Sequence, residues 1–280
     1  MTRRRNWRRA MATGLRGLLV GLVVVIMGLP LYWVATGALK TNQEIYTFPP
    51  VWIPSDPQWG NFAEAWQAVP FGRFFVNSIV STLGAVALEL LLALLSAYAL
   101  VFVRARGKGL VFAVVIAALL VPGTVTLLPN YLTVARLGWI NTYQGLIIPV
   151  AAVAFGVFLF RQHFLTLPRD LLDAARLDGC GHLGLLRHVV VPLSRPVMVT
   201  FLVIYLVAHW NDFLWPLVVT NRLEWRTVPV GVAYLYQVEG VQNWGPILAG
   251  TVMALVPMLV VYVVAQRWIV KGIGGGALKG

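Results

Sequence analysis

Side chains that could perform metal or acid–base chemistry are few in this chain, and they are scattered. His163, His182, His188 and His209 show no ligand spacing with one another, with the acids or with Cys180. Metal sites need such residues at short, regular spacings, so we expect no metal. A single cysteine also excludes an internal disulfide, and we interpret Cys180 as a small buried thiol.

Nucleotide-binding motifs are incomplete. The Gly107-Lys108 pair would end a phosphate-binding loop only if a glycine stood at the position of Phe102. The stretch from Gly272 to Ala277 imitates a dinucleotide fingerprint, but it follows an apolar run rather than a strand. We therefore expect no catalytic residue, no cofactor bound by this chain and no enzymatic activity.

Two acids stand inside long apolar runs. Glu89 interrupts residues 74–103, and Asp212 interrupts residues 197–219. A charge inside a bilayer is costly and normally faces protein or water, so we expect Glu89 to be protonated or paired with a neighbouring subunit. The sequence His209-Trp210-Asn211-Asp212 has polar and aromatic side chains that suit the lining of a solute path. The alternative is that these side chains only form hydrogen bonds between helices.

The segment from Leu172 to Pro196 carries acids, arginines and glycines between two apolar runs. Pro168 and the acids after it are typical of a helix start, and Gly179 is typical of its left-handed stop. One narrow face of this helix carries Leu171, Ala174, Ala175 and Asp178. A second amphipathic helix, closed by Pro192, contains Leu183, Leu186, Val189 and Val190. This helix, turn and helix either project toward another protein or lie on a bilayer.

Composition predicts the membrane in which these groups are placed. Hydrophobic residues make up 59% of the chain, charged residues 11%, and the mean hydropathy is +0.78. These values lie far outside the range of soluble domains. A span needs about 20 apolar residues, and lipid does not tolerate irregular backbone. We therefore expect an all-α integral membrane protein with six transmembrane helices, at residues 17–39, 74–103, 110–129, 143–160, 197–219 and 247–265.

The basic residues predict the orientation of these helices. With the amino terminus inside, most of the 22 basic residues fall in cytoplasmic segments, as the positive-inside rule requires. Both termini are then cytoplasmic, and the net charge of +12 indicates contact with membrane lipid and partner proteins, not with nucleic acid. The first apolar run is too long for a cleaved signal peptide, so we favour an uncleaved anchor. The outer segment from Lys40 to Trp66, rich in Pro and Trp, is expected to be an aromatic belt or a docking surface.

The polar segment resembles the EAA signature of permease subunits of bacterial ABC importers. That signature reads Glu-Ala-Ala, three residues, Gly, and later a Pro-x-x-x-Pro exit. The matching residues here are Asp173-Ala174-Ala175, Asp178-Gly179, Pro192 and Pro196, with no insertion. Asp173 replaces the usual Glu, and Cys180 stands where Ala is common.

Further landmarks in the family's order make the chain similar to carbohydrate-uptake permeases, specifically to the second permease of the maltose system. They are Lys40-Thr41, Glu44, Pro49-Pro50, Asn61-Phe62, Asn77-Ser78, Ala97-Tyr98-Ala99, Pro122-Gly123, Gly138 to Thr142, Trp210 to Phe213 and Gly276 to Gly280.

The resemblance implies a type I importer in the bacterial plasma (inner) membrane. Its partners would be a second homologous permease, two cytoplasmic ATPases that use ATP and Mg, and an extracytoplasmic solute-binding protein. It also implies a cytoplasmic tail at residues 1–16, a transmembrane domain at 17–270 with a coupling loop at 164–192, and a tail at 271–280. The residues expected to contact the ATPases are Asp173, Ala174, Ala175, Asp178 and Gly179, with Gly276, Ala277, Leu278, Lys279 and Gly280 of the tail. Those expected along the solute path are Glu89, His209, Trp210, Asn211 and Asp212.

Three other functions stay open at this point. The solute could be glycerol phosphate or another non-sugar compound instead of a sugar. A proton-coupled secondary transporter would use Glu89 and Asp212 as its relay. A membrane-anchored scaffold would transport nothing.

Overall fold

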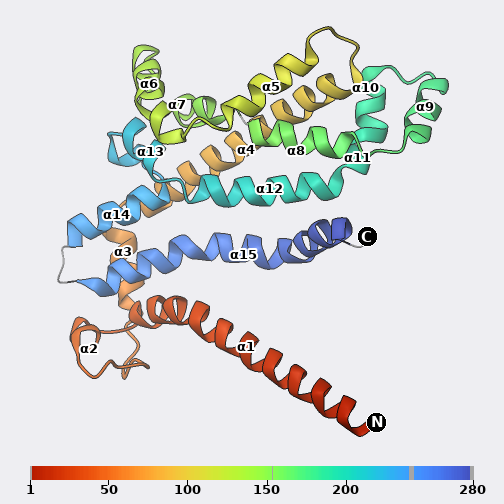
Figure 1. The fold of residues 1–280 in the computed structure, drawn as a ribbon. Coiled ribbons are helices and arrows are strands. Elements are labelled where there is room, and N and C mark those ends of the chain that lie inside the picture. Colours follow the sequence, from red (N-terminus) through yellow and green to blue (C-terminus); the bar gives the residue numbers. More distant parts are fainter. Residues whose placement is uncertain (1, 153, 240–242, 278–280) are drawn as a thin grey trace. The chain divides into compact units, whose positions relative to one another are not determined.

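The computed structural model describes the backbone of residues 2–152, 154–239 and 243–277, and the side chains of residues 13–152, 154–238 and 243–266. Over these residues the chain forms helices and no strand, which confirms the predicted fold class (Figure 1). The chain divides into two compact units. One comprises Met1–Val69 and Val232–Leu255, and the other Pro70–Gly231 and Val256–Gly280.

The first unit contains α1 (Thr2–Gly37), α2 (Asn42–Tyr46) and α3 (Gly60–Ala68), with the start of α15 (Trp244–Ala277). From Thr13 to Gly37, α1 is apolar and long enough to cross a bilayer. The short α2 begins with a capping box, because the Thr41 side chain accepts from the Glu44 amide while the Glu44 carboxylate accepts from the Thr41 amide. The Asn42 side chain then donates to Asn243, which ties α2 to the segment before α15.

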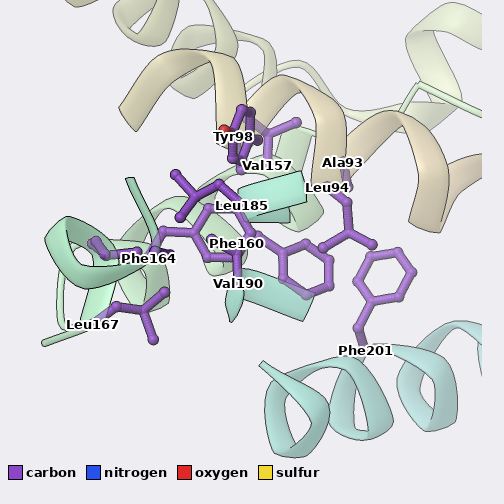
Figure 2. Close-up of a cluster of buried hydrophobic side chains, with 13 residues drawn as sticks. Ala93, Leu94, Tyr98, Val157, Phe160, Phe164, Leu167, Leu185, Val190 and Phe201 are labelled. Carbon is purple, nitrogen blue, oxygen red and sulfur yellow. The ribbon is translucent and has the colours of Figure 1, made fainter. Parts of the chain in front are cut away.

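The second unit is built around α4 (Phe71–Phe102), a helix of 32 residues. Its other helices are α5 (Lys108–Ala118), α6 (Gly123–Arg136), α7 (Tyr143–Ile147), η1 (Ile148–Val150), α8 (Ala154–Phe164), α9 (Arg169–Leu177), α10 (His182–Leu185), η2 (Leu186–Val190), α11 (Val191–Leu193), α12 (Arg195–Trp210), α13 (Leu214–Val219) and η3 (Leu223–Trp225), and α14 (Val228–Glu239) begins in this unit. Helices α8 and α12 pack along α4, and their aromatic side chains Phe160 and Phe201 meet with ring centroids 5.3 Å apart (Figure 2). Burial of these large apolar groups fixes the relative positions of the three helices.

The two ends of α4 hold different parts of the second unit (Figure 1). Near its start, the Asn77 side chain accepts a hydrogen bond from the Tyr143 hydroxyl of α7 at 3.0 Å. Near its end, the Tyr98 hydroxyl lies 3.0 Å from His182 of α10. Helices α6, α7 and α13 therefore lie at one end of α4, and the turn between α9 and α10 lies at the other.

The apolar spans are less regular than the sequence predicts. Three helices are long enough to cross alone, at Thr13–Gly37, Phe71–Phe102 and Trp244–Gln266, and three bent pairs would bring the number to six. The expected span at residues 110–129 is wrong as a single helix, because α5 and α6 meet at a bend of 98° and α6 continues past Pro129 to Arg136. The expected span at 197–219 is also broken, between Trp210 and Leu214.

The Gly107-Lys108 pair has a structural role. Gly107 has a φ of 80° and forms the turn from α4 into α5. The Lys108 ammonium donates to the Val103 carbonyl at 2.7 Å, where a cation satisfies an unpaired carbonyl at the end of α4.

Gly145 in α7 tests the packing near the start of α4. A Cβ at this position would lie 2.2 Å from the Trp139 carbonyl oxygen, which is backbone and cannot move aside easily. We therefore expect Gly145→Ala to destabilise the purified protein by about 1–3 kcal/mol. Gly109→Ala, in α5 with nothing within 4 Å of its Cβ, is the matched control and should be neutral or slightly stabilising. Equal melting temperatures for the two variants would contradict this packing.

Candidate functional site

The polar turn between α9 and α10 has the geometry that its glycine predicts. Helix α9 ends at Leu177, Asp178 caps it, and Gly179 follows with a φ of 85°. The Cys180 amide donates back to the Ala175 carbonyl at 3.0 Å and the Gly179 amide to the Arg176 carbonyl at 3.1 Å. These are the hydrogen bonds that close a helix through a left-handed residue. The predicted left-handed stop is confirmed.

The two faces of α9 separate the predicted contact residues. Leu172 and Ala175 are buried among Phe164, Leu185 and other core side chains, whereas Asp173, Ala174, Asp178 and Gly179 are exposed. Only 8% of Ala175 is exposed, because its side chain packs on its own chain.

Two leucines at the turn were not singled out by the sequence as contact residues. Leu177 is 88% exposed and Leu183 is 77% exposed, one on each side of Gly179. The sequence pattern places Leu183 on the apolar face of the second helix. The helical periodicity of the sequence does not reveal that these two leucines are exposed, because the fold of the turn sets the direction of their side chains. Exposed apolar groups beside a turn are a typical feature of a protein contact.

Asp173 already has a partner on its own helix. The Arg176 guanidinium donates to the Asp173 carboxylate at 2.8 Å, in an exposed pair three residues apart. Such pairs contribute only about 0.2–0.5 kcal/mol, so Asp173 can exchange this partner for another at small cost.

The second helix of the turn continues further than predicted. It runs through α10, the π-helical turn η2 and α11 to Leu193, so Pro192 does not close it. Pro192 is tolerated because it directly follows the π-helical turn η2, where the regular α-helical hydrogen bonds are already interrupted. The break falls at Ser194, whose hydroxyl donates to the Val190 carbonyl at 2.6 Å, and α12 leaves at 76°.

Tyr98 connects the turn to the long helix α4. Its hydroxyl lies 3.0 Å from both the Nδ1 atom and the carbonyl oxygen of His182, the first residue of α10. Tyr98 itself is buried in the core cluster (Figure 2). This contact therefore joins the turn to the body of the second unit.

Gly179 is the residue on which the turn depends. A β-branched residue at a φ of 85° is strained by about 1–2 kcal/mol, so Gly179→Val should distort the turn without affecting membrane insertion. The control is Gly181→Val, because Gly181 has a φ of −70° and nothing within 4 Å of its Cβ. We expect Gly179→Val alone to reduce transport in reconstituted vesicles. Equal loss, or equal retention, in both variants would contradict the assignment.

Glu89 and His209 form a buried pair between α4 and α12. The Glu89 carboxylate lies 2.9 Å from the His209 imidazole, and the side-chain exposures are 2% and 16%. Glu89 therefore has a partner on its own chain, whereas the sequence led us to expect either a protonated carboxyl group or a partner on a neighbouring subunit. Sequence spacing could not reveal it, since the two residues are brought together only by the packing of α12 on α4.

The remaining residues of the predicted solute set diverge at the end of α12. Trp210 is buried, with its ring centroid 6.2 Å from that of Phe75. Asn211 is exposed and donates back to the Val207 carbonyl. Asp212 lies in the break before α13, where its carboxylate accepts from the Trp215 amide at 3.4 Å. These neighbours in sequence therefore have different surroundings within this chain.

Asp212 lines a cavity of about 500 Å³ in the second unit. Polar side chains of α6 line it too, namely Thr124, Thr126 and Asn130, and Trp215 contributes from α13. The Trp215 indole N–H donates to the Gly145 carbonyl at 3.0 Å, which fixes the ring. The cavity was not predicted, because Thr124 and Thr126 lie within a run that reads as one apolar span and Asn130 directly follows it.

The remaining predicted contact residues lie in the Trp-rich segment from Lys40 to Trp66 and in the carboxyl tail. Trp52 and Trp59 are exposed, and the Trp52 carbonyl accepts from the Tyr32 hydroxyl of α1. Lys40 is buried, its ammonium lies 4.2 Å from the centre of the Trp33 ring, and burial lowers the pKa of this amine.

In the tail, Leu278, Lys279 and Gly280 lie outside the described residues, and only the backbone of Gly276 and Ala277, at the end of α15, is described.

The Glu89–His209 pair makes a testable contribution to stability. Removing one partner of a buried pair typically costs about 3–5 kcal/mol, so Glu89→Ala should lower the melting temperature of the purified protein. Glu89→Gln, which can still form a hydrogen bond with the imidazole, should lower it less. In a double-mutant cycle, His209→Ala should add little to Glu89→Ala. Strictly additive losses would show that the two side chains do not interact.

Breaks inside apolar helices are a feature of membrane transport proteins, where they line cavities. Comparison with known proteins also indicates a membrane transport protein. Residues 89–274 match the family described as binding-protein-dependent transport system inner membrane component, and the chain belongs to this family.

Curated relatives cover almost the whole chain. The sn-glycerol-3-phosphate transport system permease protein UgpE of Pectobacterium atrosepticum is 33% identical over 263 residues, which cover 91% of this chain and 93% of the relative. The protein of the same name from Agrobacterium fabrum is 32% identical over 273 residues, 95% of this chain and 97% of the relative.

Solved structures share the fold. A chain of a bacterial ABC transporter involved in the import of the acidic polysaccharide alginate superposes with a TM-score of 0.81 at 21% identity, over 92% of this chain and 96% of that chain. A chain of a bacterial alginate ABC transporter in complex with an alginate pentasaccharide-bound periplasmic protein gives 0.62 at 16% identity, with 94% of each chain covered. The resemblance to ABC importer permeases is confirmed.

Proposed function

We propose that this chain is the permease subunit of an ATP-driven, binding-protein-dependent importer of hydroxyl-rich solutes, either sugars or glycerol phosphate. The exposed turn from α9 to α10, held by Tyr98 against α4, is the observation that carries the proposal. Family membership supports the transport role, and the names of the relatives support the solute class.

The turn would be seated on one of two cytoplasmic ATPase subunits. Its outward surface offers carboxylates at Asp173 and Asp178, the small Ala174 and two exposed leucines. Closure of the ATPases around ATP and Mg would displace the turn, and the Tyr98–His182 contact would pass that displacement to α4. Transport then follows from a rigid-body change between inward-facing and outward-facing states.

The remaining partners follow from the same role. A second permease of the same type would complete the path, and an extracytoplasmic binding protein would deliver the solute near the Trp-rich cap. The carboxyl tail from Gly276 to Gly280 would reach the ATPases, which requires both termini in the cytoplasm of the bacterial cell. The positive-inside distribution supports that orientation.

Two adjacent alanines provide a sharp test of the ATPase contact. Ala174 is exposed and Ala175 is buried, although both belong to the signature. In the assembled importer, a cysteine at position 174 should crosslink to an ATPase subunit, and a cysteine at position 175 should not. Crosslinking at 175 alone, or labelling of position 174 only from outside the cell, would overturn the assignment.

A proton-coupled transporter is the second candidate, and the buried Glu89–His209 pair is the observation that favours it. The two mechanisms differ in energy source. We expect uptake into vesicles to stop with vanadate and to survive a protonophore, and we expect Glu89→Gln to retain that pattern. Uptake that survives vanadate and collapses with the protonophore would exclude the ATP-driven mechanism.

A further inference from the structure

The polar cavity lies where three helix breaks meet. Its lining comes from the start of α6 after the 98° bend, from Val150 at the end of η1 with Ala152 after it, and from Asp212 between α12 and α13. Helix ends leave backbone N–H and C=O groups without helical partners. Inside a membrane such ends occur only where protein surrounds them or where they line a cavity that holds water or a polar ligand. Three breaks around one cavity therefore indicate a binding site.

The polar groups of this cavity suit sugar hydroxyls. Thr124 and Thr126 contribute hydroxyl groups, Asn130 an amide and Asp212 a carboxylate. Together they offer both donors and acceptors, and Trp215 offers an aromatic surface beside them. A few polar groups in a partly apolar cavity are typical of small-molecule sites.

The charge of the cavity argues against a phosphate. Of the residues that line it, Asp212 is the one with an ionisable side chain, and no lysine or arginine is among them. The start of α6 contributes only about half a positive charge, and the Asp212 carboxyl group repels an anion whenever it is ionised. Phosphate sites normally supply arginine or lysine, or several backbone amides without a competing acid.

We propose that this cavity is a solute subsite for neutral polyols and sugars, and that Asp212 excludes their phosphate esters. The inference rests on the proposed permease function and narrows its solute class. A preference for neutral solutes would distinguish this chain from the relatives named for sn-glycerol 3-phosphate transport.

The test measures protection of a single cysteine in the assembled importer. Cys180 is the one native cysteine of the chain, so Cys180→Ala provides the background. Thr124→Cys places a thiol in the cavity, and Val125→Cys, on an exposed residue that does not line it, is the matched control. The complex is held in nanodiscs without the binding protein, so that any preference among the probes comes from the permeases. The probes are two matched pairs, glycerol with glycerol 3-phosphate and glucose with glucose 6-phosphate.

We expect glycerol or glucose to slow the labelling of position 124 in a saturable way, roughly tenfold at about ten times the Kd. Their phosphate esters should not slow it, and position 125 should be unaffected by any probe. In Asp212→Asn, the phosphate esters should gain protection, while unchanged labelling at position 125 verifies that α6 is intact. Equal or better protection by the esters in the native background would overturn the selectivity, and no protection by any probe would overturn the subsite. ATP-dependent uptake, measured separately, decides whether the permease function itself holds.

Discussion

Backbone hydrogen bonding in lipid is the constraint on which the rest of this structure depends. A helix satisfies its own amides, so α1 and α4 can cross as uninterrupted runs. Each bend or break must instead be covered by protein or by a polar cavity. The chain places three of its breaks around the cavity at one end of α4, and its polar turn, followed by the break at Ser194, at the other. The need to satisfy backbone hydrogen bonds in lipid therefore decides where both the candidate solute site and the candidate coupling site can form.

Packing along α4 connects these two sites. Helices α8 and α12 pack along it, and their aromatic core extends to Leu172 and Ala175 of α9. At the opposite end, Asn77 of α4 contacts α7, whose Gly145 carbonyl accepts from Trp215 at the cavity. Close-packed cores move as discrete bodies and do not deform gradually. A displacement at the turn is thus expected to reach the cavity end of the same unit.

Sequence patterns predicted what local rules decide. The helical class, the polar turn and the left-handed Gly179 follow from composition, periodicity and glycine chemistry, and the structure confirms them. The partner of Glu89 could not be predicted, because His209 lies 120 residues away and only the packing of α12 on α4 joins them. The cavity was missed for a related reason: Thr124, Thr126 and Asn130 are too few to mark a break within an apolar run. Ala174 and Ala175 look equivalent in the signature, and only the packing of α9 separates them.

The central claim is that the state of the ATPases controls access to the cavity. The most direct measurement is the labelling of a cysteine at position 124 by a membrane-impermeant thiol reagent, applied from outside to the complete importer. The account predicts slow labelling in the resting state and fast labelling after trapping with ATP and vanadate, when the permeases face outward. Equal labelling in both states, or a change in the opposite direction, would contradict it.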